Sequence, residues 1–172
     1  YKNGISAAAL MAKDFAPIRN VIAGYVIEGL TLLAGAPKIG KSWMALGWGV
    51  SVASGTQAFG TIAVEQGDVL YLALEDNERR LKKRLRKMGI VAPERLTLVT
   101  QWPDLDNGCV AEMEAWANDV ARPIMIIVDV LNKVRPASSR SESQYEADYR
   151  TLSGLHAFAS ARNIAIVVVH HT

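Results

Sequence analysis

The sequence predicts a three-layer α/β domain whose central sheet is mostly parallel. Three observations carry this prediction: five short apolar runs do not alternate polar with apolar residues, helical patterns separate the runs, and a glycine-rich octapeptide follows the first run. Continuously apolar strands are typical of sheets covered by helices on both faces. Strands that alternate with helices indicate right-handed crossovers between parallel neighbours.

The five apolar runs are the predicted strands. They cover residues 30–34, 69–74, 96–99, 124–128 and 164–169. Residues 1–29 fit less well, with a short helix expected near residues 6–13 and an extended lead-in near residues 21–27. We therefore predict an N-terminal appendage over residues 1–29 and an α/β core over residues 30–172. Because the chain begins at Tyr1 rather than Met and stops just after an apolar run, we expect a fragment whose core is truncated at its C-terminal end.

Three helical patterns separate the later strands. In each pattern, apolar residues recur three, four or seven positions apart, which places them on one face of a helix. The positions are Leu81, Leu85 and Met88 in the first helix, Val110, Met113, Ala117 and Val120 in the second, and Tyr145, Tyr149, Leu152 and Ala159 in the third.

Composition limits the classes of protein that fit. The 172 residues are 50% hydrophobic and 21% charged, with a formal net charge of +2, which suits one ordinary domain and does not by itself indicate nucleic acid. Cys109 is the only cysteine, so it excludes an internal disulfide and favours a reducing cytoplasm. The longest apolar stretch, near residues 44–53, is too short to span a bilayer, and we expect no membrane association.

The glycine-rich octapeptide is the strongest motif in the chain. It matches the pattern G-x-x-x-x-G-K-[ST] at every fixed position and reads Gly35, Ala36, Pro37, Lys38, Ile39, Gly40, Lys41 and Ser42. The two glycines permit a tight turn whose backbone N–H groups surround phosphate, and the following helix adds its N-terminal dipole. Lys41 can reach the β- and γ-phosphates of ATP, and the Ser42 hydroxyl can bind Mg²⁺. A glycine-rich turn with an incidental lysine is the alternative.

Two acidic residues complete the predicted site. Asp129 ends the fourth strand, where a carboxylate faces the crevice at the carboxyl edge of the sheet and can hold the metal. Glu75 follows the second strand at the same edge and is the predicted base that polarises the attacking water. Alternatively, Asp129 only caps a turn, and Glu75 belongs to an acidic helix start. Asp76 or Asn77 suffices for that start and leaves Glu75 free.

A histidine pair, His170 and His171, ends the last strand at this edge. A polar side chain here could sense the γ-phosphate. A zinc pair is disfavoured because successive strand residues point to opposite faces. A solvated pair is the other alternative.

Seven basic residues crowd the first helix. They are Arg79, Arg80, Lys82, Lys83, Arg84, Arg86 and Lys87. They could follow a DNA backbone. We favour a solvated helix face, because no aromatic residues interleave to stack on bases.

Four segments resemble the RecA-like ATPases and, among them, the RepA-like replicative helicases of plasmids and phages. They are residues 30–40 with Lys41-Ser42-Trp43, GDVLYLALEDNERRL at 67–81, IIVDVLNKVRP at 126–136, and residues 145–172, which close on VVVHHT. The resemblance implies a RecA-like P-loop core that assembles into a hexameric ring with ATP at subunit interfaces.

By this resemblance, Lys41 and Ser42 bind phosphate and Mg²⁺, Trp43 extends the nucleotide-binding segment, Glu75 is the catalytic glutamate and Asp129 the second acidic motif. His171 falls where RecA and DnaB relatives carry a glutamine that contacts the γ-phosphate. The expected function is a motor that moves on single-stranded DNA. A non-translocating regulatory ATPase is the alternative. The predicted base Glu75 disfavours a small-molecule kinase, because a kinase should avoid a residue that activates water.

Overall fold

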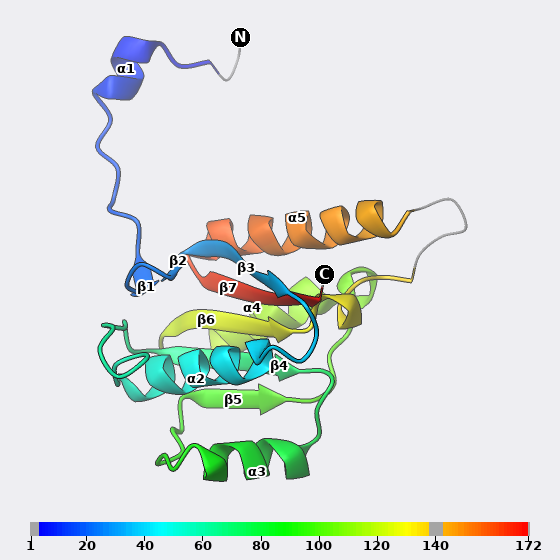
Figure 1. Ribbon diagram of the computed structural model, residues 1–172. Helices are drawn as coiled ribbons and strands as arrows, with labels where there is room; N and C mark the ends of the chain where they lie inside the picture. Colours follow the sequence, from blue (N-terminus) through cyan, green and yellow to red (C-terminus); the bar gives the residue numbers. More distant parts are fainter. Residues whose placement is uncertain (1–3, 138–142, 172) are drawn as a thin grey trace.

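The computed structural model describes residues 4–137 and 143–171, and its centre is a five-stranded parallel sheet (Figure 1). The strands are β3 (Gly29–Gly35), β4 (Asp68–Ala73), β5 (Leu96–Val99), β6 (Pro123–Asp129) and β7 (Ala165–His171). Their order across the sheet is β3-β7-β6-β4-β5, and every neighbouring pair is parallel. All five predicted strands are confirmed, each within two residues at either end.

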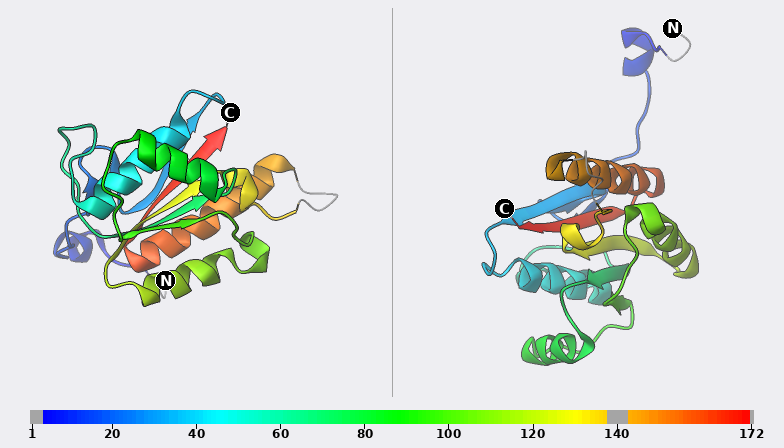
Figure 2. Two further views of the ribbon diagram at one scale, coloured as in Figure 1. Left: turned by 90° about the horizontal axis from the view of Figure 1, so that it is seen from below. Right: turned by 90° about the vertical axis from the view of Figure 1, so that its right-hand side faces the viewer.

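Helices cover both faces of this sheet (Figure 2), which confirms the three-layer prediction. Helix α2 (Lys41–Ser54) packs on one face, and α3 (Glu78–Lys87) borders the same layer through Leu81. Helices α4 (Cys109–Asp119) and α5 (Gln144–Arg162) pack on the other. Two apolar cores result, because alternate strand residues point to opposite faces: Tyr71 faces α2, whereas Leu72 faces α4 and α5.

The N-terminal part contains a helix and a hairpin. Helix α1 (Ala7–Met11) lies away from the rest of the chain (Figure 1), and β1 (Asn20–Ile22) pairs with β2 (Val26–Ile27) in an antiparallel hairpin. Val21, Ile22 and Val26 of this hairpin are fully buried in the α2-side core. A division at residue 29 stays a prediction.

The predicted face of α5 was partly wrong. Tyr145 and Tyr149 are 77% and 66% exposed, whereas Leu152 packs against the core and Ala159 is buried. The residues buried along this helix are Ala147, Thr151, Leu155, Phe158 and Ala159. Tyr145 and Tyr149 are four residues apart and therefore share one face of the helix, but this face is turned toward solvent. The smaller side chains lie against the sheet.

Short segments complete the chain. The 3₁₀ turns η1 (Leu105–Asn107) and η2 (Leu131–Lys133) precede α4 and follow β6. Thr172, which closes the His-His-Thr motif, lies outside the described residues. Within residues 4–137 and 143–171, no helix combines the length and apolar character that crossing a membrane requires.

Candidate functional site

The glycine-rich loop connects β3 to α2 in the conformation that its sequence predicts. Gly35 (φ 153°), Lys38 (φ 66°) and Gly40 (φ 96°) all have positive φ, and Gly40 is the N-cap of α2. The glycines at the two ends adopt this backbone without a Cβ penalty. The loop therefore turns tightly and ends at a helix N-terminus, which favours anions.

Lys41 lies at the mouth of this loop and is only 5% exposed. Its Nζ donates hydrogen bonds to the carbonyl oxygens of Gly35 at 2.6 Å and Ala36 at 2.7 Å. A cavity of about 230 Å³ adjoins the ammonium group. It is lined by Lys38, Gly40, Lys41, Ser42, Trp43, Arg84 and His171. Because Lys38, Lys41 and Arg84 are basic side chains, the cavity suits a phosphate group.

Asp129 joins the loop through Ser42. The Ser42 hydroxyl donates to Asp129 Oδ1 at 3.0 Å, and Asp129 is 7% exposed. A hydroxyl and a carboxylate are the hard oxygen ligands that Mg²⁺ prefers, so this pair fits the metal that the motif implies. The prediction that Asp129 lies at the carboxyl edge beside the loop is confirmed.

Tyr71 contacts the same carboxylate and was not among the predicted site residues. Its hydroxyl donates to Asp129 Oδ2 at 2.6 Å and lies 3.2 Å from the Ser42 carbonyl oxygen. Burial, followed by the negative charge of Asp129, raises the pKa of Tyr71 well above its ordinary value, so the phenol remains a donor. In the sequence, Tyr71 looks like one more residue of an apolar strand. No sequence pattern indicates that Asp129 is its hydrogen-bond partner.

Glu75 lies beside His171. The Nε2 atom of His171 is 3.7 Å from Glu75 Oε2, and the Glu75 side chain is 48% exposed. Asn77 caps α3 by accepting from the Arg80 N–H, and Asp76 accepts from the Asn77 N–H. Since these two residues serve the helix start, Glu75 is not needed there. Its catalytic role stays a prediction.

His170 and His171 lie beside the glycine-rich loop. In the described part of the chain, no group of three His, Cys, Asp or Glu side chains could hold a metal ion. His170 pairs in register with Ala34, and His171 with Gly35, directly beside the loop. His171 also lines the cavity beside Lys41, and its role as a γ-phosphate sensor stays a prediction.

Arg84 is a second residue that sequence reasoning did not place in the site. It lines the phosphate cavity, pairs with Asp76 at 2.8 Å and lies 5.5 Å above the Trp43 ring. Lys87 lies 5.6 Å from the same ring. Trp43 is thus held by two cations at the border of the cavity. The sequence could have suggested Arg84 only as one of seven basic residues on α3.

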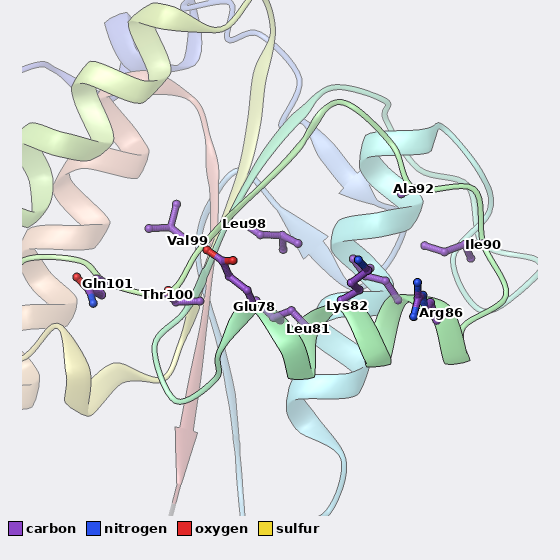
Figure 3. A pocket seen from close by; sticks show the side chains of 11 residues that line it. Glu78, Leu81, Lys82, Arg86, Ile90, Ala92, Leu98, Val99, Thr100 and Gln101 are labelled. Atoms are coloured by element: carbon purple, nitrogen blue, oxygen red, sulfur yellow. The ribbon is translucent and has the colours of Figure 1, made fainter.

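A larger cavity, of about 810 Å³, lies elsewhere, between α3 and β5 (Figure 3). Leu81 and Leu85 of α3 and Leu98 and Val99 of β5 line it. No predicted site residue in the described part of the chain lines it. The larger cavity therefore does not coincide with the predicted phosphate site, which lies at the glycine-rich loop, Asp129 and the N-terminus of α2.

The chain matches one known family over nearly its whole length. The sequence model of a family described as an AAA domain matches residues 4–172. The chain belongs to the AAA domain family. Comparison with curated protein sequences finds no match.

Solved structures confirm the RecA-like P-loop fold of this AAA domain. A DnaB-like replicative helicase, described with its interactions with primase, superposes with a TM-score of 0.64 at 14% identity, over 84% of this chain and 40% of that one. The ATPase domain of G40P superposes with a TM-score of 0.59 at 13% identity, over 83% and 56%. The chain thus spans about half the length of these proteins, or less.

Proposed function

We propose that this domain binds and hydrolyses ATP as the motor of a RepA-like replicative DNA helicase. The observation that carries the proposal is the meeting of Lys41, Ser42 and Asp129 with Glu75 and His171 at one sheet edge. A kinase needs the phosphate cradle but no base for water. The glutamate beside the cavity therefore favours hydrolysis.

Each residue has a distinct part in this proposal. The loop from Gly35 to Ser42 surrounds the phosphates, and the Lys41 ammonium compensates the charge of the β- and γ-phosphates. Trp43 continues the binding segment. Ser42 and Asp129 would hold Mg²⁺, which would neutralise negative charge on the phosphates.

Glu75 and His171 act on the water and the γ-phosphate. The Glu75 carboxylate accepts a hydrogen bond from water and orients it for in-line attack. His171 donates from Nε2 to a γ-phosphate oxygen when the phosphate is bound. Its Nε2 lies 3.7 Å from Glu75 Oε2, and this closeness supports a link between the nucleotide and the glutamate. The end of β7 would thereby report the state of the nucleotide.

The helicase part of the proposal concerns partners. Single-stranded DNA is the proposed track, and a hexameric ring with ATP at subunit interfaces is the proposed assembly. The fold shared with a DnaB-like replicative helicase supports both. The single cysteine favours the reducing cytoplasm as the place of action.

ATP binding and turnover test the roles of individual residues. Lys41→Ala should weaken nucleotide binding at least about tenfold, because a charge-assisted contact to phosphate is lost. Glu75→Gln should bind ATP normally and lose about 100-fold or more in kcat, as expected for loss of a general base. Lys13→Ala and Glu112→Gln, both exposed and far along the chain from the site, are matched controls. Normal binding by Lys41→Ala would overturn the assignment of the site.

The motor role needs a separate measurement. ATPase rates of the full-length protein with and without single-stranded DNA, together with its mass in the presence of nucleotide, distinguish a ring motor from a non-translocating regulator. Stimulation by DNA and a hexameric mass are expected. A monomer whose turnover ignores DNA would contradict the motor and leave the ATPase intact.

A further inference from the structure

We infer that Tyr71 is a positioning residue for the Asp129 carboxylate, and that Mg²⁺-dependent nucleotide binding relies on its hydroxyl group. Because Asp129 is a metal ligand only under the proposed function, this inference rests on that function. Tyr71 would not touch nucleotide or metal. It would act through the orientation of Asp129.

The parallel register of β4 and β6 places Tyr71 for this role. Tyr71 is paired with Ile127, two residues before Asp129 on the same face of the sheet. Its ring is fully buried in the core under α2, together with Leu46 and Ile127. A side chain of this length extends along the face toward the carboxyl edge, and its hydroxyl ends beneath Asp129 and the first turn of α2.

The two oxygens of the Asp129 carboxylate are each held by a different donor. Ser42 Oγ donates to Oδ1 at 3.0 Å, and Tyr71 Oη donates to Oδ2 at 2.6 Å. The hydroxyl of Tyr71 has a single proton, and the Ser42 carbonyl at 3.2 Å is the longer, neutral alternative. The proton therefore goes to the carboxylate, since charge-assisted hydrogen bonds are shorter and stronger.

Two donors on opposite oxygens fix the plane of the carboxylate. Rotation of that plane would break both hydrogen bonds, one to the loop helix and one to β4. Ser42 is itself a proposed metal ligand, so its lone pairs must turn toward the metal while its proton stays on Asp129. Tyr71 is then the donor that does not change its role when the metal binds. Hydrogen-bonding partners of metal ligands typically change metal affinity by 10–100-fold when they are removed.

Packing alone does not account for the hydroxyl. Phenylalanine would fill the same apolar space, and a buried hydroxyl costs free energy unless it is hydrogen-bonded. In this structure the bond goes to a group of the proposed metal site. A purely structural role for Tyr71 predicts a loss of stability with unchanged Mg²⁺ dependence, and the two roles can therefore be separated.

The test is a Mg²⁺ titration of nucleotide binding by the Tyr71→Phe variant. A fluorescent ribose-labelled ATP analogue serves as the probe, first in EDTA and then at increasing Mg²⁺. We expect affinity in EDTA within about twofold of the unsubstituted protein and an apparent Kd for Mg²⁺ raised about tenfold or more. Tyr149→Phe, which removes an exposed hydroxyl on α5, is the matched control and should change neither value.

The outcomes separate the inference from the proposed function. If the unsubstituted protein does not bind the analogue, or Lys41→Ala binds it normally, the proposed function fails. If both behave as expected and Tyr71→Phe keeps the original Mg²⁺ dependence, only the inference is overturned, whatever the change in thermal stability. Tyr71→Met also fills the core without a hydroxyl, and it replaces the phenylalanine variant if that variant does not fold.

Discussion

Two neighbouring acids at the end of β4 have different surroundings. Asp76 is nearly buried and pairs with Arg80 at 2.7 Å and Arg84 at 2.8 Å. Glu75 is half exposed, and its Oε2 lies 3.7 Å from His171 Nε2. Asp76 thus holds α3 against the site, while Glu75 keeps its carboxylate available to water and substrate. Exchange of the two roles would require the start of α3 to move.

A second buried group gives a pH-dependent prediction at this scale. Cys109 is fully buried, and burial raises its pKa from 9.0 to about 11. In the unfolded chain the thiol ionises near pH 9, whereas in the folded chain it stays protonated until about pH 11. The stabilisation is therefore complete below pH 9 and is lost as the pH rises through 11. The free energy of unfolding should fall by at most about 2–3 kcal/mol over this pH range.

Urea denaturation under reducing conditions measures this effect. The free energy of unfolding should fall more steeply between pH 9 and 11 for the unsubstituted protein than for Cys109→Ala, which lacks the titrating thiol. Comparing the two proteins removes the contribution of tyrosines and lysines that titrate in the same range. Parallel curves would show that the thiol ionises equally in both states.

At the scale of helices and strands, the patterns that could be predicted are those governed by local burial. The strand at residues 124–128 was evident because both of its faces are covered, so every position is apolar. The exposed face of α5 could not be predicted in the same way. The spacing of Tyr145 and Tyr149 places them on one helix face but does not show whether that face is buried or exposed. The strand order was beyond sequence reasoning, and so was the bond from Tyr71 to Asp129, since 58 residues separate the partners.

The start of α5 is stabilised by a capping box. The Ser143 hydroxyl accepts from the Glu146 N–H, and the Glu146 carboxylate accepts from the Ser143 N–H at 2.7 Å. Ser143→Ala should lower the free energy of unfolding at pH 7 by about 1 kcal/mol, because an N-cap is lost. Ser160→Ala, at an exposed position near the other end of α5, should change it little.

The decrease in the free energy of unfolding that Ser143→Ala causes should also depend on pH. Hydrogen bonds from the Ser143 backbone and hydroxyl lower the pKa of Glu146 below 4.5. Its contribution is thus present above pH 4.5 and is lost as the pH falls through the folded-state pKa. Thermal unfolding of both proteins at pH 7 and pH 3 should show a smaller difference at pH 3. An equal difference would mean that Glu146 does not take part in the cap.

Across the whole molecule, the strand order assembles the site. Insertion of β7 between β3 and β6 pairs Gly35 with His171 and Asp129 with Val169, while Asp129 also pairs with Ala73. Four strands therefore end within two residues of one level, and the residues that follow them share one edge. The register of parallel strands, rather than any single contact, brings together groups that are more than 130 positions apart.

Gly67, at the entry to β4, controls how closely β4 approaches β6. A Cβ there would clash with Ile124 Cγ1 in β6 and lie 2.9 Å from the carbonyl oxygen of Arg122, the residue before β6. Backbone cannot yield as a flexible side chain can, so Gly67→Ala should force the two strands apart. We expect a loss of about 2–4 kcal/mol in the free energy of unfolding, as for overpacking in a rigid core. Chemical denaturation measures this loss.

Gly47→Ala is the matched control for that substitution. Gly47 lies inside α2, where a Cβ would meet only the end of Met88 at an ordinary 3.7 Å. Alanine there should stabilise the protein by about 0.5–1 kcal/mol, because glycine inside a helix loses more backbone entropy on folding. The same glycine-to-alanine change is thus expected to have opposite signs at the two positions. Equal effects would mean that the β4–β6 spacing tolerates a side chain, and that the register joining Ala73 to Asp129 does not depend on this close approach.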